Sequence, residues 1–442
     1  MKQIALTHET EGSLVLEGAG ITRPFRGARY LPAGSPEEVV EEQLDLLLED
    51  SSPGEIASGM SRLERLLGLA RSSARNASGR PVYLSVTGAE GEEAWRSLVQ
   101  DGWVEALGGE RSRGSLGVKL HHRRENFWEG PELALPLSNR GGTRVTTPLP
   151  ISNHTDWHSG HENYVEIAGS DVSGDLPAAM RLEFTNLGGS ATTYLFLGMD
   201  QHPSGSEFFT PWLEGEDALM AVGVTDSMCS GGKKVELAWQ GAEETELCAW
   251  LLREPQPARA RGRFFKVLLR AADGGIHEPD TWLRANVKIN GSPVWEGAWT
   301  LAPLGQELLE LNLLPLPPYL AGLDSLAGVS LALQARCGTS GGHAFALDFL
   351  QITPLDGWRR LVSAGCGVPD GFTLYEDGLR GCVYTGPGRL FETDFAAYGD
   401  ALRLQPGITQ RLVVLQAAAG GQALAERGMA VQAFTRARRR SL

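Results

Sequence analysis

The chain has 442 residues, of which 42% are apolar and 21% are charged, so it can bury large cores and is not a disordered protein. Its 40 basic and 54 acidic side chains give a net charge of -14, which argues against nucleic-acid binding, because the phosphate backbone requires a basic surface. The length indicates about two to four domains, and the 55 glycines and 24 prolines indicate many turns between short strands.

Residues 1–17 contain no apolar segment of a signal peptide, and no run approaches the roughly 18 apolar residues that a membrane helix needs. We therefore expect neither Sec-dependent export nor membrane insertion. The five cysteines form no C-x-x-C pair and are expected to be reduced core residues, with a Cys366–Cys382 disulfide left open. They are Cys229, Cys248, Cys337, Cys366 and Cys382.

The first 32 residues predict two strands joined by a turn. Ser35-Pro36-Glu37-Glu38 then has the composition of a capped helix start, and Val40, Leu44, Leu47 and Leu48 follow at helical spacing. A second start at Ser52-Pro53 leads into an apolar stripe that ends at Ala70. The sequence therefore predicts two amphipathic helices between residues 36 and 72.

Beyond Gly79 the apolar pattern is typical of strands. Residues 82–86 and 116–124 alternate with period two, and residues 95–104 fit a short helix or a bent strand. Residues 139–160 have no sustained period and predict a linker or extended arm. From Asn163 onward, short strands and turns predict β-sandwiches or jelly rolls, including a tight turn at Asn290-Gly291.

The strongest polar cluster lies in the expected linker. His154, His158 and His161 would share one face of a helix and could bind zinc, but Pro150 and Gly160 disfavour a helix there. We keep these three histidines only as weak metal candidates and interpret the segment as a polar linker.

Two short strings match catalytic motifs without the required structural context. Residues 338–342 (GTSGG) match G-x-S-x-G, and residues 230–233 (SGGK) match S-x-x-K, but no helix is expected after either serine. The first string is interpreted as a hairpin turn, and no phosphate-binding glycine loop occurs. We therefore predict no catalytic residue, no cofactor and no enzymatic activity.

Aromatic residues provide a different kind of site. Trp282, Trp295 and Trp299 lie in a strand-rich region, where an exposed indole could stack on the face of a sugar. These three residues are the candidate glycan contacts. Arg436, Arg438, Arg439 and Arg440 form a basic C-terminal tail that is either solvated or docked onto an acidic neighbour.

Several segments resemble the distal tail proteins of siphophages. They are the exit Arg124-Glu125-Asn126-Phe127-Trp128-Glu129-Gly130, residues 164–169 (YVEIAG), residues 182–186 (LEFTN), and Gln405-Pro406-Gly407 with 412–414 (LVV). Thr409-Gln410 stands where this family's pattern has Asn. The resemblance covers residues 1–200 and 357–442, and it implies an N-terminal split-barrel-like domain that forms a ring, followed by a β-sandwich.

The intervening residues 201–356 resemble a carbohydrate-binding jelly roll. The similar segments are the Ser-Gly-Gly turn at 230–232, the strand 262–270 (GRFFKVLLR), the Asn-Gly turn, and the terminal strand 347–354 (LDFLQITP). This resemblance implies a possible contact with a glycan on the host surface.

Together the resemblances imply a mainly β chain with a small α+β N-terminal part. The expected domains are a ring-forming domain (1–140), a linker and the first part of a second sandwich (141–200), an inserted jelly roll (201–356), and the rest of that sandwich with the basic tail (357–442).

The implied function is a structural protein of the virion tail tip or baseplate. It would assemble in the host cytoplasm into a homo-oligomeric, hexameric ring between the tail tube protein and the tail-tip hub proteins. Two alternatives are a non-viral glycan-binding β-sandwich protein and a glycoside hydrolase whose carboxylates are far apart in sequence.

Overall fold

The computed structural model describes residues 3–17, 25–26, 39–49, 52–75, 80–88, 94–106, 115–139, 142–153, 163–202, 212–252, 263–316, 328–386, 394–418 and 428–440. The chain divides into two compact units. Unit 1 contains Met1–Leu133, Ser173–Ala178 and Arg436–Leu442, and unit 2 contains Ala134–Val172 and Ala179–Thr435. Antiparallel strands dominate both units, which confirms the mainly β fold class.

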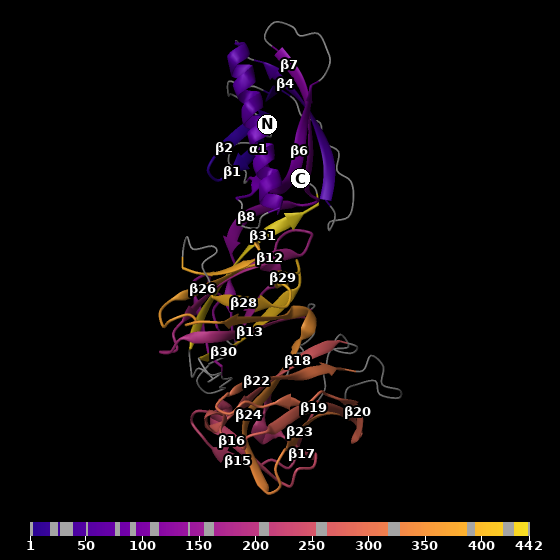
Figure 1. Cartoon of the computed structure of the whole chain (residues 1–442), viewed down its shortest axis with the longest axis vertical. Coiled ribbons are helices and arrows are strands. Elements are labelled where there is room, and N and C mark those ends of the chain that lie inside the picture. Colours follow the sequence, from indigo (N-terminus) through magenta and orange to yellow (C-terminus); the bar gives the residue numbers. More distant parts are fainter. Residues whose placement is uncertain are drawn as a thin grey trace. The chain divides into compact units, whose positions relative to one another are not determined.

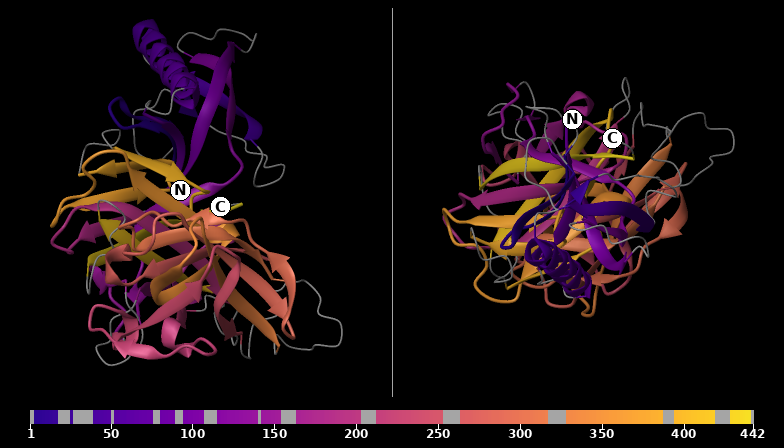
Figure 2. Two further views of the ribbon diagram at one scale, coloured as in Figure 1. Left: turned by 60° about the horizontal axis from the view of Figure 1, so that its bottom comes forward. Right: turned by 90° about the horizontal axis from the view of Figure 1, so that it is seen from above.

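Unit 1 is one antiparallel sheet with a long helix, α1 (Pro53–Arg75), packed on it (Figure 1). Its strands pair in the order β2-β1-β5-β6-β7-β4-β3, and β8 also pairs with β6. Figure 2 shows α1 beside the indigo and purple strands from two further directions. The strands are β1 (Gln3–His8), β2 (Gly12–Glu17), β3 (Phe25–Arg26), β4 (Val39–Glu49), β5 (Val82–Thr87), β6 (Trp95–Ala106), β7 (Ser115–Glu125) and β8 (Trp128–Ala134).

Helix α1 confirms the second predicted helix and its start. The Ser52 hydroxyl accepts a hydrogen bond from the Glu55 amide at 3.3 Å and donates one to the Glu55 carboxylate at 2.7 Å, so Ser52 caps the first turn and the Glu55 side chain holds its hydroxyl in place. Its apolar stripe enters the core of unit 1 through Leu63, Leu66, Leu67 and Ala70.

The first predicted helix is wrong, because its residues form strand β4, which pairs with β7 from Val39 to Glu49. Val40, Leu44 and Leu46 are buried and alternate with exposed polar residues, so a period of two fits this segment as well as the helical period. The proposed cap at 35–38 lies outside the described residues. The described pairings also do not support the expected split barrel in unit 1.

A buried ion pair joins the neighbouring strands β4 and β7 in unit 1. The Arg124 guanidinium donates to both carboxylate oxygens of Glu42, at 2.8 and 2.6 Å, and both side chains are about 1% exposed. Burial alone would raise the pKa of Glu42, but hydrogen bonds from His122 and Arg124 lower it below its ordinary value. The pair therefore stabilises the folded state while Glu42 is ionised, and this contribution is lost as the pH falls through the lowered pKa.

We expect Glu42→Gln to destabilise unit 1 by about 3 kcal/mol, because it leaves the buried Arg124 charge without its carboxylate. Glu41→Gln is the matched control, since it removes the same charge from an adjacent side chain that is 72% exposed, and it should change stability by less than about 0.5 kcal/mol. Urea unfolding measures both. Equal effects of the two substitutions would contradict the role of the buried pair.

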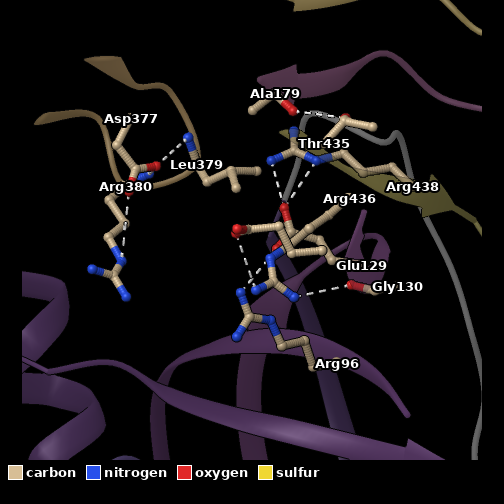
Figure 3. A network of polar contacts seen from close by, with 11 residues as sticks. Arg96, Glu129, Gly130, Ala179, Asp377, Leu379, Arg380, Thr435, Arg436 and Arg438 are labelled. Atoms are coloured by element: carbon tan, nitrogen blue, oxygen red, sulfur yellow. Dashed lines mark hydrogen bonds and ion pairs between the residues drawn. The ribbon is translucent and has the colours of Figure 1, made fainter. Parts of the chain in front are cut away.

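The C-terminal tail is docked rather than solvated, because the end of β31 (Met429–Arg439) belongs to unit 1. Arg438 donates two hydrogen bonds to Glu129, at 3.0 and 2.7 Å, and Arg436 donates to the carbonyl of Gly130 (Figure 3). Arg436 also pairs with Glu132, Arg439 stacks over Trp95, and the Arg440 amide donates to Asp175. The acidic neighbour considered for the tail is therefore in the same chain.

Removal of residues 436–442 should destabilise unit 1 selectively, because these contacts tie the end of the chain to β8. Hydrogen–deuterium exchange followed by mass spectrometry should then show faster exchange in β5 to β8, while strands of unit 2 keep their protection. Removal of residues 441–442 alone, which leaves every arginine of the tail in place, should have no effect. Uniform loss of protection in both units would show that the tail has no specific role in unit 1.

Unit 2 contains a first sandwich, here named the carrier sandwich, whose two sheets share one apolar core. Leu182 and Phe184 of one sheet and Leu195, Leu197 and Leu412 of the other are fully buried in that core. One sheet has the order β31-β12-β26-β27, with β10 on β31 and β29 on β12, and the other has the order β28-β25-β13-β30-β11-β9. The strands are β9 (Leu137–Ser138), β10 (Leu149–Ile151), β11 (Tyr164–Ile167), β12 (Ala178–Asn186), β13 (Thr192–His202), β25 (Trp358–Ser363), β26 (Thr373–Asp377), β27 (Cys382–Thr385), β28 (Phe395–Tyr398), β29 (Arg403–Leu404) and β30 (Thr409–Ala418).

A second sandwich, residues 212–354, lies in the chain between β13 and β25, and we name it the inserted sandwich. Since β13 and β25 pair directly with each other, the insertion leaves the carrier sheet continuous. Its sheets have the orders β15-β16-β24-β18-β22, with β14 on β24, and β17-β23-β19-β20, with β21 on β19. The strands are β14 (Trp212–Glu214), β15 (Gly223–Thr225), β16 (Lys233–Gln240), β17 (Thr245–Leu251), β18 (Phe264–Ala271), β19 (Thr281–Ile289), β20 (Ser292–Glu296), β21 (Thr300–Leu301), β22 (Leu308–Pro315), β23 (Val329–Cys337) and β24 (Gly342–Pro354).

Short 3-10 helices connect several strands of unit 2. They are η1 (Gly169–Asp171), η2 (Gly215–Asp217), η3 (Ser230–Gly232), η5 (Asp273–Gly275) and η6 (Leu355–Gly357). No helix among the described residues is long and apolar enough to span a bilayer.

The structure tests three local predictions. Asn290 and Gly291 have φ values of 49° and 83° and form the predicted tight turn between β19 and β20. Residues 338–342 form a turn, but the hairpin prediction is wrong, because the turn joins β23 in one sheet to β24 in the other. Residues 95–104 form part of β6, which has a bulge between Val99 and Asp101.

Candidate functional site

The outer face of the β17-β23-β19-β20 sheet collects polar and aromatic side chains. In β19, Leu283, Ala285 and Val287 are buried in the core of the inserted sandwich, so the alternate residues Trp282 and Arg284 lie on the opposite face. The register places Arg336 of β23 opposite Trp282 and Gln334 opposite Arg284. Residues far apart in the sequence therefore meet on one outer face of the sheet, where Arg284 is buried and Trp282, Gln334 and Arg336 are half-buried.

Two tryptophans and two arginines on this face stack on one another. The Cζ atom of Arg336 lies 5.4 Å from the ring centroid of Trp282 and 4.7 Å from that of Trp299. The Cζ atom of Arg284 lies 4.4 Å from the ring centroid of Trp299. We name Trp282, Trp299, Arg284 and Arg336 the Trp–Arg cluster. Guanidinium groups held on indole faces at these distances have a restricted orientation.

The two arginines of the Trp–Arg cluster differ in their ionic partners. Arg284 pairs with Glu244 at 3.0 Å and with Glu296 at 3.5 Å, and it also donates to the Gln334 amide oxygen. Arg336 is half-buried, and no carboxylate within the described ranges lies at ion-pair distance from it. Arg284 is therefore paired with two carboxylates, whereas Arg336 has no carboxylate partner among the described residues.

Of the three tryptophans predicted to contact a glycan, Trp282 and Trp299 lie near the same arginine and Trp295 lies apart from it. Trp282 and Trp299 both contact Arg336, but Trp295 lies on β20, is 41% exposed, and donates its indole N–H to the Leu313 carbonyl at 3.3 Å. Sequence reasoning missed Arg284 and Arg336. Their only signal is the period-two alternation that places them on the outer face of the sheet, and the pairing of β19 with β23 is not visible in the sequence.

The predicted histidines His154, His158 and His161 lie outside the described residues. In the parts of the chain that the structure describes, no group of three or more His, Cys, Asp or Glu side chains is arranged to hold a metal ion.

All five cysteines are free. Three are buried as expected, but Cys366 is exposed and Cys382 is half-buried, so the core assignment of Cys366 is wrong. Its surroundings are a surface turn that follows β25.

The S-x-x-K string contributes to a polar cluster just before the first residue of β16. The Ser230 hydroxyl donates to the Glu214 carboxyl at 2.7 Å, and the Ser230 amide donates to Asp348 at 2.9 Å. Asp348 in turn accepts a 2.6 Å hydrogen bond from Arg270. Ser230 is fully buried, and its two hydrogen bonds tie the turn before β16 to Glu214 and Asp348.

Burial raises the pKa of Glu214 to about 8, and the nearby charge of Asp348 adds to this effect. Because the unfolded carboxyl group has its ordinary pKa of 4.5, the folded chain binds more protons between these two values. The free energy of unfolding should therefore decrease as the pH rises through this window.

Glu214→Gln should reduce this pH dependence and raise the free energy of unfolding at pH 8 by about 1–2 kcal/mol, because the amide carries no charge to bury. Part of the slope remains, since burial also raises the pKa values of Glu125, Asp348 and Glu376 to about 7. Thermal unfolding between pH 5 and 8.5 measures the effect. Glu236→Gln, on the exposed side of β16, removes the same charge and should leave the slope unchanged. A Glu214→Gln protein with the same pH slope as the wild type would contradict the assignment.

Comparisons with known proteins give only distant similarities. No protein-family model matches the sequence, and a search of curated proteins gives no match. Among solved structures, the chain is similar to the baseplate of phage p2 in its activated conformation with Sr, with 10% identity over 78% of this chain and 98% of that chain and a TM-score of 0.23. The corresponding structure with Ca has 11% identity over the same shares and the same TM-score.

An exo-β-1,3-galactanase from Phanerochaete chrysosporium, solved with galactose, shows 11% identity over 70% of this chain and 78% of that chain, with a TM-score of 0.19. TM-scores and identities this low do not by themselves assign a fold or a function to the chain. The function is therefore argued from the chain's own residues and topology.

Proposed function

We propose that this chain is a structural virion protein of a tailed phage. It forms a hexameric ring at the distal end of the tail tube, connects the tube protein to the tail-tip hub proteins, and carries the inserted sandwich as a glycan-contacting accessory domain. It acts in the tail tip, after assembly in the host cytoplasm, without enzymatic activity.

The nested topology supports this proposal most directly. The chain begins in unit 1, enters the carrier sandwich, leaves it after β13 for the inserted sandwich, returns at β25, and ends in unit 1 through β31. An insertion between two paired strands adds a complete domain without interrupting the sheet that carries it. This is the order of parts that the resemblance to distal tail proteins and to a carbohydrate-binding jelly roll implies.

Unit 1 also presents an exposed aromatic side chain suited to contact with a second copy. Trp103 of β6 is 50% exposed, and it stacks on His121 of β7 with 4.7 Å between the ring centroids and 4° between the ring planes. Tryptophan is enriched at the centres of protein interfaces, where it buries a large area with few rotatable bonds. We therefore assign Trp103 to the contact between neighbouring copies in the ring.

Size-exclusion chromatography with light scattering, together with negative-stain images of the full chain, tests the ring. We expect hexameric rings for the wild type, and a shift toward monomers of at least tenfold in the dissociation constant for Trp103→Ala. Phe372→Ala is the matched control, because Phe372 is also an exposed aromatic residue but lies in unit 2. A wild-type protein that is strictly monomeric, with no ring in assembled tails, would overturn the proposal.

The second candidate is a glycan-binding protein without a viral role, and the Trp–Arg cluster favours it. The same solution measurements separate the two candidates. A monomeric protein that binds sugar through Trp282 and Trp299 would fit the second candidate, whereas ring formation is expected only for the first.

A further inference from the structure

We propose that the Trp–Arg cluster binds an anionic group carried by a glycan, either a sugar carboxylate or a phosphate. Arg336 receives the anion, while Trp282 and Trp299 provide apolar surface for the sugar ring. This inference rests on the glycan contact in the proposed function and specifies the class of ligand.

The charge on Arg336 is the first argument. The neighbouring cations on the same face are paired, Arg284 with Glu244 and Glu296, and Lys288 with Glu246. The chain has 54 acidic residues, yet the described ones supply no carboxylate to Arg336. A half-buried guanidinium has lost part of its hydration, so an incoming anion gains more from pairing with it than from pairing with a fully solvated arginine.

The orientation of Arg336 is the second argument. Arg336 lies over the rings of Trp282 and Trp299, which confine its guanidinium, and the hydrogen bonds of this group form in its plane through its N–H groups. Two parallel N–H donors match the two oxygens of a carboxylate or of a phosphate. The indoles carry no lone-pair acceptor for these N–H groups, so contact with the two rings leaves the donors of Arg336 available to an anion.

The surroundings limit the number of anionic groups that the site accepts. Glu244 and Glu296 are both largely exposed beside Arg284, with side-chain exposures of 52% and 55%. These carboxylates repel additional negative charge close to the single unpaired cation. We therefore expect one anionic group per bound segment and a modest dependence on salt, unlike the steep dependence of a protein that neutralises many phosphates.

Isothermal titration of the full-length protein with three probes tests the proposal. The probes are an oligogalacturonate, its fully methyl-esterified and therefore neutral form, and an oligomer of glycerol phosphate. We expect binding of at least one anionic probe, and at least tenfold weaker binding of the neutral ester than of the parent acid if the carboxylate is the ligand. Binding of the phosphate oligomer alone would identify phosphate as the source of the anion and also supports the proposal.

The variants separate the anion contact from the sugar contact. Arg336→Gln should weaken binding of the anionic probe at least tenfold, and Arg336→Lys, which keeps the charge but lacks the planar fork, should give an intermediate loss. Arg403→Gln, at an exposed residue of β29, removes the same charge and should bind as the wild type does. Trp282→Ala and Trp299→Ala should weaken binding, whereas Trp295→Ala, at the indole that lies away from Arg336, should not.

Three outcomes would overturn the inference. They are measurable binding of the acid and its methyl ester with the same affinity, unchanged binding by an Arg336→Gln protein with a wild-type circular dichroism spectrum, and no binding of any probe by the wild type. The first outcome leaves a neutral glycan contact in place. None of them affects the ring, which the light-scattering experiment measures separately.

Discussion

Buried arginine–carboxylate pairs are the constraint on which the layers of this protein depend. Each of the three sheet-built bodies contains one such pair: Glu42–Arg124 in unit 1, Arg359–Glu376 in the carrier sandwich, and Arg270–Asp348 in the inserted sandwich. All six side chains are less than a tenth exposed. A buried charge without its partner costs several kcal/mol, so each pair disfavours any strand register that would separate its two side chains.

The two arginines on the outer face of the inserted sandwich differ in their pairing. Arg284 and Arg336 both lie over the ring of Trp299, but among the described residues carboxylates pair with Arg284 and not with Arg336. In a protein with a net charge of -14, Arg336 is a half-buried cation beside two indoles that has no acidic partner among the described residues. This difference from Arg284 is the observation on which the proposed anion contact is based.

The inserted sandwich packs directly against the carrier sandwich. Gly198 of β13 allows the closest approach between the carrier and inserted sandwiches, since a Cβ atom there would lie 1.8 Å from the Thr353 methyl carbon. Phe196, Trp358 and Phe349 are buried in a small apolar cluster between the same two bodies, and Asn163 donates to the Gln351 side chain. The inserted sandwich is therefore packed against its carrier by both apolar and polar contacts.

The sequence by itself determined the features that depend on local order. The β-rich composition, the capped helix that begins at Pro53 and the Asn290-Gly291 turn all follow from residue type and spacing, because their physical causes act within a few positions of the chain. The alternation of Leu283, Ala285 and Val287 likewise predicts a strand with one buried face. The tryptophans were recognised as candidates for the same local reason, since their side chains stand in a strand-rich segment.

Tertiary structure alone decided the features that depend on pairing partners. Residues 39–49 fit a helix and a strand nearly equally well, and it is β7, more than 60 residues away, that selects the strand by supplying Arg124 to the otherwise isolated charge of Glu42. The G-x-S-x-G turn crosses between sheets instead of closing a hairpin, because β23 and β24 each find their partners elsewhere in the chain. The contacts of Arg336 depend on pairing in the same way, because its two indole neighbours lie about 40 and 50 residues earlier in the chain. Side-chain packing over the whole domain selects which strands are neighbours, and adjacency in the sequence does not.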